Sequence, residues 1–208
     1  MKIETFDFPD LLKGNDVALR LLEPGDAPLL AQAASENRDS YKYSPVPQGD
    51  EGSRLYIQRA LNQRATGERF PYAIVWRNRV VGTTSFMEFK HWVRPNQPPH
   101  PGPDVVEIGY TWLAAFAQRT GCNTESKLLL LEFAFETWRV ERVSFRTDER
   151  NARSRNAILR IGAQFEGVRR ADVPNVDGSV RNSAYFSIVK QEWPQVKTGL
   201  RTKLLRSP

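Results

Sequence analysis

The most informative stretch of the sequence runs from Trp112 to Lys127. It reads as the end of a strand, a turn that contains Gly121, and the start of a Leu-rich helix. The first turn of a helix leaves main-chain N–H groups without partners, and the positive end of the helix dipole lies behind them. Such groups favour a phosphate, so the stretch predicts a cradle for a pyrophosphate.

The strand that leads into this turn carries a candidate proton acceptor. Alternation along residues 105–113 places Glu107 on the same face as Gly109 and Thr111. Tyr110 is then expected on the opposite face. A carboxylate at this position could accept a proton from an attacking group, or it could only orient a ligand or pair with an arginine.

Other residue types that carry chemistry are scarce. Cys122 is the only cysteine, so it can form neither an internal disulfide nor a cysteine zinc site, and it indicates a reducing compartment. His91 and His100 flank a segment with prolines at 95, 98, 99, 101 and 103, and they lack the spacing of metal ligands. We therefore expect no metal site.

The composition fits one globular domain over residues 1–208, with 40% hydrophobic and 26% charged residues. The net charge is +6, but the arginines are scattered, and the only basic cluster is a short tail within 195–208. An anionic small ligand explains this charge at least as well as a nucleic acid does. No apolar run approaches the roughly 20 residues that span a bilayer, so we expect a cytoplasmic protein with no membrane partner.

The elements that must position these residues form an α/β (α+β) pattern, with a mixed, mostly antiparallel sheet flanked by helices. The Pro-rich segment 91–104 is expected to be an exposed loop. One right-handed crossover joins the Glu107 strand to the next strand through the Leu-rich helix, and ligands favour the break beside such a crossover. We expect strands over 17–22, 72–76, 80–87, 105–113, 142–147, 165–168 and 184–189. We expect helices over 26–35, 51–66, 124–138 and 154–161. The aromatic residues expected in the core are Trp76, Phe86, Phe133, Phe135 and Trp138.

Three ordered motifs add a family resemblance. They are EIGYTWL at 107–113, QRTGCNTESKLLLLEFAFE at 118–136 and NARSRNAILRIGAQFEGVRR at 151–170, and a late EWP follows at 192–194. With these motifs the chain resembles the GNAT N-acetyltransferase superfamily, in particular the RimJ/RimL-type branch named for ribosomal-protein N-terminal acetyltransferases. The resemblance extends from about Val17 to Pro194 and implies a GNAT-like sheet of about seven strands with about four helices.

The resemblance implies acetyl-CoA as the cofactor. In the family the turn before the Leu-rich helix holds the pyrophosphate through main-chain N–H groups, with the helix here expected to begin near Thr124. The family more often has a small residue where Asn123 stands. The cofactor-binding residues implied are Trp112, Leu113, Gln118, Arg119, Thr120, Gly121, Cys122, Asn123, Thr124, Asn151, Ser154 and Arg155.

The resemblance also assigns catalytic roles. Glu107 matches a Glu that in many members accepts a proton directly or through water, and a main-chain N–H near Leu113 would bind the oxyanion. The family often has a Tyr proton donor seven residues after its Asn, but here that position is Ile158. Ser154 or a water would then have to donate the proton to the leaving thiolate, although Ser154 could equally be a helix cap.

These implications lead to an acetyl-CoA-dependent N-acetyltransferase. Its acceptor would be a primary amine, either a peptide N-terminus or a small molecule, that attacks the thioester directly. The missing Tyr suggests an alternative, a non-catalytic acyl-CoA-binding or regulatory module. A basic nucleic-acid-binding protein is a third possibility that rests on net charge alone. Pairing is common in this branch, and the sequence leaves the oligomeric state open between a monomer and a homodimer.

Overall fold

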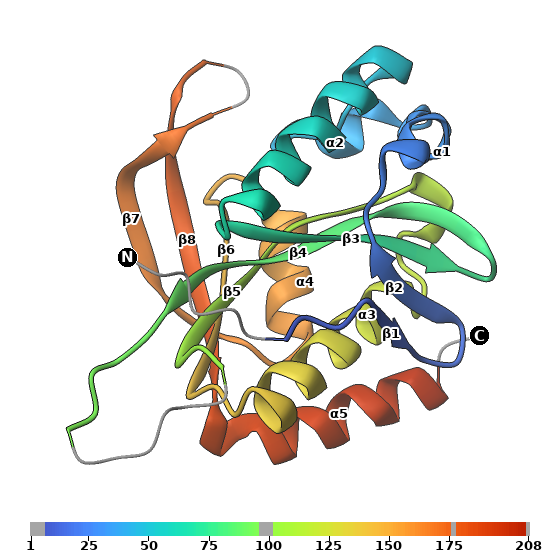
Figure 1. Cartoon of the computed structure of the whole chain (residues 1–208). Coiled ribbons are helices and arrows are strands. Elements are labelled where there is room, and N and C mark those ends of the chain that lie inside the picture. Colours follow the sequence, from blue (N-terminus) through green and yellow to red (C-terminus); the bar gives the residue numbers. More distant parts are fainter. Residues whose placement is uncertain (1–6, 96–101, 176–177, 207–208) are drawn as a thin grey trace.

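The computed structural model describes residues 7–95, 102–175 and 178–206. In this part of the chain eight strands form one sheet in the order β1-β2-β3-β4-β5-β6-β8-β7, and five α-helices pack against it (Figure 1). The strands are β1 Leu11–Lys13, β2 Val17–Leu21, β3 Arg69–Trp76, β4 Arg79–Lys90, β5 Val105–Leu113, β6 Arg142–Asp148, β7 Gln164–Pro174 and β8 Val180–Val189. The helices are α1 Ala27–Ala33, α2 Gly49–Ala65, α3 Cys122–Glu132, α4 Ala152–Arg160 and α5 Trp193–Leu205.

The predicted mixed, mostly antiparallel α/β fold is confirmed, but two elements were not predicted. Strand β1 has only three residues, too few to show an alternating pattern. Residues 195–208 were expected to be a basic tail, whereas most of them belong to α5. Trp193 and Leu200 are buried on this helix, and Lys197 lies 2.6 Å from Glu136, so packing and charge hold it in place. No helix among the described residues is both long and apolar enough to cross a membrane.

Helices cover both faces of the sheet. Figure 1 shows α1 and α2 above the strands β3 and β4, and α3 and α5 below the sheet. The predicted core aromatics Phe86, Phe135 and Trp138 are buried, and Phe133 is partly buried against them. Phe133 and Phe135 lie in a π-helical turn, Phe133–Thr137, that follows the end of α3, and Trp138 comes directly after it. Phe86 on β4 packs against Phe133 and Trp138, with ring centroids 6.3 Å and 4.8 Å away, so the predicted apolar stripe extends beyond α3.

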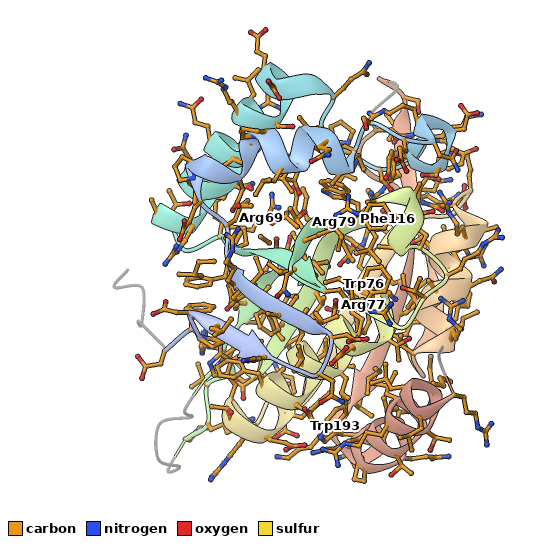
Figure 2. All side chains as sticks on the ribbon, turned by 90° about the vertical axis from the view of Figure 1, so that its right-hand side faces the viewer. Arg69, Trp76, Arg77, Arg79, Phe116 and Trp193 are labelled. Atoms are coloured by element: carbon orange, nitrogen blue, oxygen red, sulfur yellow. The ribbon has the colours of Figure 1, made fainter. Side chains whose placement is uncertain are left out.

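Trp76 was also predicted to lie in the core, but it is only half-buried. It ends β3 next to a two-residue turn, where Arg77 and Asn78 both have positive φ, as a tight β-hairpin turn requires. Its ring stacks on exposed Phe116 with centroids 6.3 Å apart. Figure 2 shows this pair together with Arg77 and Arg79, whose guanidinium groups lie over the two rings.

The sheet parts in its middle. Strands β5 and β6 form the parallel pair of the predicted crossover, yet they pair only where Val105–Glu107 faces Arg142–Ser144. Beyond Glu107, β5 continues to Leu113 without β6 beside it. Among the described residues, the edge of β5 that faces β6 therefore has no strand partner over residues 108–113, so the sheet does not use its main-chain groups there.

A β-bulge changes the predicted faces of β5. The register between β4 and β5 shifts at Thr83 and Ser85, and opposite this shift Tyr110 has a φ of 50°. Because the bulge adds one residue, Thr111 contacts Lys127 on α3, while Tyr110 faces the α2 side. The prediction that Thr111 shares a face with Glu107 is therefore wrong.

Candidate active site

Glu107 lies where the central strands part. It is the last residue of β5 that pairs with β6, and its partner in the register is Ser144. Its side chain is buried, with 4% of the residue exposed. Gly109 provides the space, because a Cβ atom there would lie 2.7 Å from Met87 Sδ and 3.3 Å from Glu107 Oε1. The shared face of Glu107 and Gly109 was predicted, and it lets the carboxylate lie flat on the sheet.

The partner of Glu107 is Arg146 on β6. The Arg146 Nε atom lies 3.1 Å from Glu107 Oε1, and the same guanidinium contacts Glu88 at 3.2 Å and Asp172 at 3.8 Å. Burial raises the pKa of Glu107 to about 7, while Arg146 opposes this rise and Glu88 adds to it. A carboxylate with a pKa near neutrality is suited to accept a proton at physiological pH.

The predicted phosphate loop connects the short 3₁₀ turn Ala115–Ala117 to α3. Within the described residues, the main-chain N–H groups of Arg119, Thr120, Gly121 and Asn123 have no hydrogen-bond acceptor in the protein. They lie at the N-terminus of an eleven-residue helix. This is the arrangement that favours an anion.

Two details of this loop differ from the predictions. Helix α3 begins at Cys122 and not near Thr124, with Gly121 as its N-cap in a right-handed conformation (φ −66°, ψ −16°). The left-handed residue is Arg119, with a φ of 61°. The loop therefore does not use the conformational freedom of Gly121, and the left-handed turn is made two residues earlier in the chain.

Cys122 and Thr124 are less exposed than their neighbours in this loop. The Cys122 N–H donates to Thr120 Oγ1 at 3.1 Å, so that main-chain group is already used. The thiol is buried, and burial raises its pKa to about 12, which makes it unreactive at neutral pH. Thr124 is buried as well, whereas Asn123 is half-exposed.

Gln118 connects this loop to three other segments. Its Nε2 donates to the carbonyl of Leu113 at 2.9 Å and to Ser40 Oγ at 3.2 Å. Its Oε1 accepts a hydrogen bond from Arg153 Nη1 at 2.9 Å, and the other Arg153 nitrogen donates to the Ser40 carbonyl. The start of α4 is thus tied to the phosphate loop across the open gap.

Leu113 ends β5 beside the loop. The next N–H, of Ala114, donates to the Val81 carbonyl on β4 at 2.6 Å. Main-chain groups of a strand alternate in direction, so those of Leu113 face away from β4 toward the gap. The Leu113 carbonyl also accepts from Tyr41 Oη at 2.9 Å. Trp112 is buried, and its indole N–H has no acceptor in the described part of the protein.

Helix α4 borders the other side of the gap. Asn151 is its N-cap, and Asn151 Oδ1 accepts from the Ser154 N–H at 3.0 Å. Ser154 is therefore in the first turn and is not the cap, and α4 begins two residues earlier than predicted. Arg155 donates to the Glu149 carbonyl at 3.2 Å and lies over the ring of Phe165, which leaves it less available for a phosphate. Ile158 is buried, at 9% exposure.

The structure brings Glu107, Leu113, the phosphate loop and Asn151 to the borders of one gap. Arg146 and Tyr41 are further site residues that the sequence did not reveal. Strand alternation offered a signal for Arg146, because it shares a face with Ser144, the register partner of Glu107. Tyr41 lies in a short 3₁₀ turn, Arg38–Tyr41, and no pattern marked it.

The arrangement fits a long cofactor with an anionic end. The free N–H groups of the loop suit its phosphates, the open edge of β5 suits amide groups along its arm, and the buried indole N–H of Trp112 is a donor without a partner among the described residues. In the same part of the chain, no group of three His, Cys, Asp or Glu side chains is placed to hold a metal ion.

Comparison with known proteins identifies the family of the chain. The acetyltransferase (GNAT) domain family matches residues 16–164. The chain is 26% identical over 182 residues to a protein of Bacillus subtilis (strain 168) named "Putative ribosomal N-acetyltransferase YdaF", which covers 85% of this chain and 93% of that protein. It is 25% identical over 170 residues to "Probable N-acetyltransferase YjcK" of the same organism, covering 78% of this chain and 88% of that protein.

Solved structures agree. A "putative acetyltransferase" from T. thermophilus superposes with a TM-score of 0.80 at 30% identity, covering 96% of this chain and 100% of that one. RimJ of Mycobacterium smegmatis, in complex with CoA-disulfide, shares the fold with a TM-score of 0.73 at 19% identity, over 90% of this chain and 88% of that one. The names of the relatives agree with the predicted RimJ/RimL-type branch. Since the family match covers well over half of its length, the chain belongs to the GNAT family of acetyltransferases.

Proposed function

We propose that this acetyltransferase transfers the acetyl group of acetyl-CoA, the donor that GNAT acetyltransferases use, to a primary amine by direct attack on the thioester. The observation that carries the proposal is the position of Glu107. It is a buried carboxylate with a pKa near 7 at the end of the β5–β6 pairing, on the strand that leads to an unpaired anion-binding loop. A buried carboxylate with a shifted pKa beside such a loop is a candidate for a functional group.

Different residues around the gap would bind different parts of the cofactor. The N–H groups of Arg119, Thr120, Gly121 and Asn123 would hold the pyrophosphate, and the Asn151 amide nitrogen would donate to the pantetheine arm. When bound, the cofactor supplies a thioester carbonyl as the acetyl donor. The Leu113 N–H, which faces the gap, would donate to that carbonyl oxygen as negative charge develops on it.

Glu107 would manage the proton of the acceptor. A primary amine is mostly protonated at neutral pH and cannot attack until it loses a proton. The ionised carboxylate takes this proton directly or through a water, and Arg146 can keep its contacts with Glu88 and Asp172 as Glu107 turns to the amine. The leaving thiolate belongs to a thiol of pKa about 8.5, so Ser154 or a water suffices as its proton donor.

The acceptor is either a peptide N-terminus or a small amine. A peptide is favoured by the names of two relatives, the ribosomal N-acetyltransferase of Bacillus subtilis and a ribosomal-protein-serine acetyltransferase of Vibrio cholerae. An α-amino group also has a pKa of only about 7.7–8.0, so a base with a pKa near 7 can deprotonate it at little cost. The competing function, a non-catalytic acyl-CoA-binding module, is favoured by Ile158 in the place of the family's Tyr.

Two measurements separate these functions. Titration calorimetry with coenzyme A and acetyl-CoA tests binding, and thiol release with a panel of amines and N-terminal peptides tests turnover. Transfer that falls at least a hundredfold in Glu107→Gln, with coenzyme A affinity retained, supports the enzyme. The control is Glu88→Gln, because Glu88 also contacts Arg146 but is half-exposed. Binding without turnover for every acceptor supports the module, and absence of both refutes the cofactor assignment.

A further inference from the structure

Two buried cations lie on opposite sides of the β5 bulge. Arg69 on β3 is 3% exposed and Lys127 on α3 is 5% exposed. Neither forms an ion pair with a carboxylate among the described residues. Burying a charge without an opposite partner costs free energy of folding. Two such side chains beside one distorted residue, Tyr110, therefore indicate a role for them at that residue.

Arg69 holds Tyr110 from the α2 side, where Figure 2 shows it between the upper helices and the sheet. Its guanidinium carbon lies 3.7 Å from the centroid of the Tyr110 ring, a close cation–π contact. One of its Nη atoms donates to Tyr56 Oη at 3.0 Å. That hydroxyl is 2.8 Å from Thr83 Oγ1, which in turn donates to the Tyr110 carbonyl at 3.1 Å.

Lys127 holds the next residue from the α3 side. Its Nζ donates to Thr111 Oγ1 at 2.6 Å and to Thr84 Oγ1 at 3.3 Å, and the two hydroxyls lie 2.8 Å from each other. Burial lowers the pKa of this lysine to about 7, which eases its presence in the core. Both networks therefore end on the bulge. The Arg69 network passes through Thr83 on β4, and the Lys127 network passes through the next residue, Thr84.

The bulge needs this support. Tyr110 has a φ of 50°, which an aromatic residue adopts only when its surroundings impose it. The extra residue also reverses which main-chain groups of residues 111–113 face the gap between β5 and β6, because a shift of one residue exchanges the two sides of a strand. Loss of the bulge would therefore turn the Leu113 N–H away from the gap.

We propose that Arg69 and Lys127 are positioning residues that hold the Tyr110 bulge and thereby keep the main chain of residues 111–113 in register for the cofactor. The inference rests on the proposed function for its activity readout, but the bulge itself can be observed without any ligand. Neither side chain takes part in the proton transfers assigned to Glu107.

The test compares Arg69→Met and Lys127→Met with Leu200→Ala, a control that creates a cavity under α5, outside both networks. Backbone NMR and amide exchange of residues 109–113 report the bulge in the free protein. We expect both Met variants to change these signals, to weaken coenzyme A binding at least tenfold, and to raise the KM for acetyl-CoA more than they lower kcat. Arg69→Lys, which keeps a cation, should recover part of the affinity.

Two experimental outcomes would overturn the proposal. Unchanged signals at 109–113 in both Met variants would overturn it, as would a loss of affinity no larger than that of Leu200→Ala at equal stability. Where a Met variant fails to fold, Tyr56→Phe removes the relay from Arg69 to the Tyr110 carbonyl and is held to the same two criteria. A wild-type protein that binds no coenzyme A would refute the proposed function, while the NMR comparison would still decide the role of the two cations.

Discussion

The Arg146 guanidinium pairs with Glu107 through its Nε atom, at 3.1 Å, although the two residues lie on strands that separate immediately beyond Glu107. The side chain of Glu107 is buried, with 5% exposed, whereas that of Arg146 is 18% exposed. Burial raises the pKa of Glu107 and the arginine limits the rise, so the base strength of the carboxylate is a balance of two opposing effects.

The first prediction concerns the pH dependence of transfer. The base must be ionised, and the pKa of Glu107 is raised to about 7, so kcat/KM should rise with pH up to about 7 and then level off. At pH 6 the rate should be roughly a tenth of the plateau. In Glu107→Gln this limb should disappear. Acceptors with different amine pKa values serve as the control, because a limb that follows the acceptor would show that Glu107 does not set it.

The second prediction concerns Arg146→Gln. Its positive charge lowers the pKa of Glu107, so its removal should move the acidic limb of kcat/KM to higher pH and reduce the rate at pH 7. Activity should be largely regained at high pH. Arg169→Gln is the matched control, since Arg169 contacts Asp172 at 3.2 Å in the same cluster but does not contact Glu107. An equal shift in both variants would contradict a specific effect of Arg146.

The third prediction separates main-chain from side-chain binding in the phosphate loop. Gly121 has a φ that any residue can adopt, so Gly121→Val should fold with a loss of about 1 kcal/mol or less, yet its side chain should obstruct the N–H groups. Coenzyme A affinity should fall at least tenfold by calorimetry. Arg119→Gly should instead gain stability, about 1 kcal/mol, by relieving the positive φ, with a smaller loss of affinity. A reversed order of affinities would show that the Arg119 side chain is the main contact.

The fourth prediction concerns the start of α4. Asn151→Ala should cost about 1 kcal/mol of stability because the N-cap is lost, whereas Asn151→Asp keeps a capping oxygen and should keep the stability. Both should weaken coenzyme A binding if the amide N–H₂ contacts the cofactor. Ser154→Ala leaves the cap intact, so a fall in kcat without a change in melting temperature would assign the hydroxyl to proton donation. Unchanged kcat would assign that step to water.

Much of the fold could be predicted because local patterns determine it. The apolar spacing of Leu128, Leu131 and Phe135 predicted α3, and alternation predicted most strands. The start of α3 was placed two residues too late because the helix is capped by Gly121, which provides no side-chain cap that would mark the boundary in the sequence. Short β1 and the basic helix α5 have weak patterns and depend on tertiary packing.

The site could be predicted only in part. Glu107, the loop and Asn151 came from motifs, and the crossover explains why they meet at one gap. The bulge at Tyr110 was not predictable from alternation, because it depends on a positive φ imposed by contacts with β3, β4 and α3. The contact of Arg146 with Glu107 depends on which strands become neighbours, and Arg69 and Lys127 look like ordinary surface residues in the sequence.

The short pairing of β5 with β6 has a mechanical consequence. In the described part of the chain, three residue pairs are the whole strand pairing between the β1–β5 half of the sheet and the β6-β8-β7 half, and Glu107 is at the end of that pairing. The acid therefore lies at the end of the strand pairing that joins the two halves in this part of the chain. A cofactor bound between β5 and β6 would contact both halves, so binding it would also stiffen the sheet beside the proton acceptor.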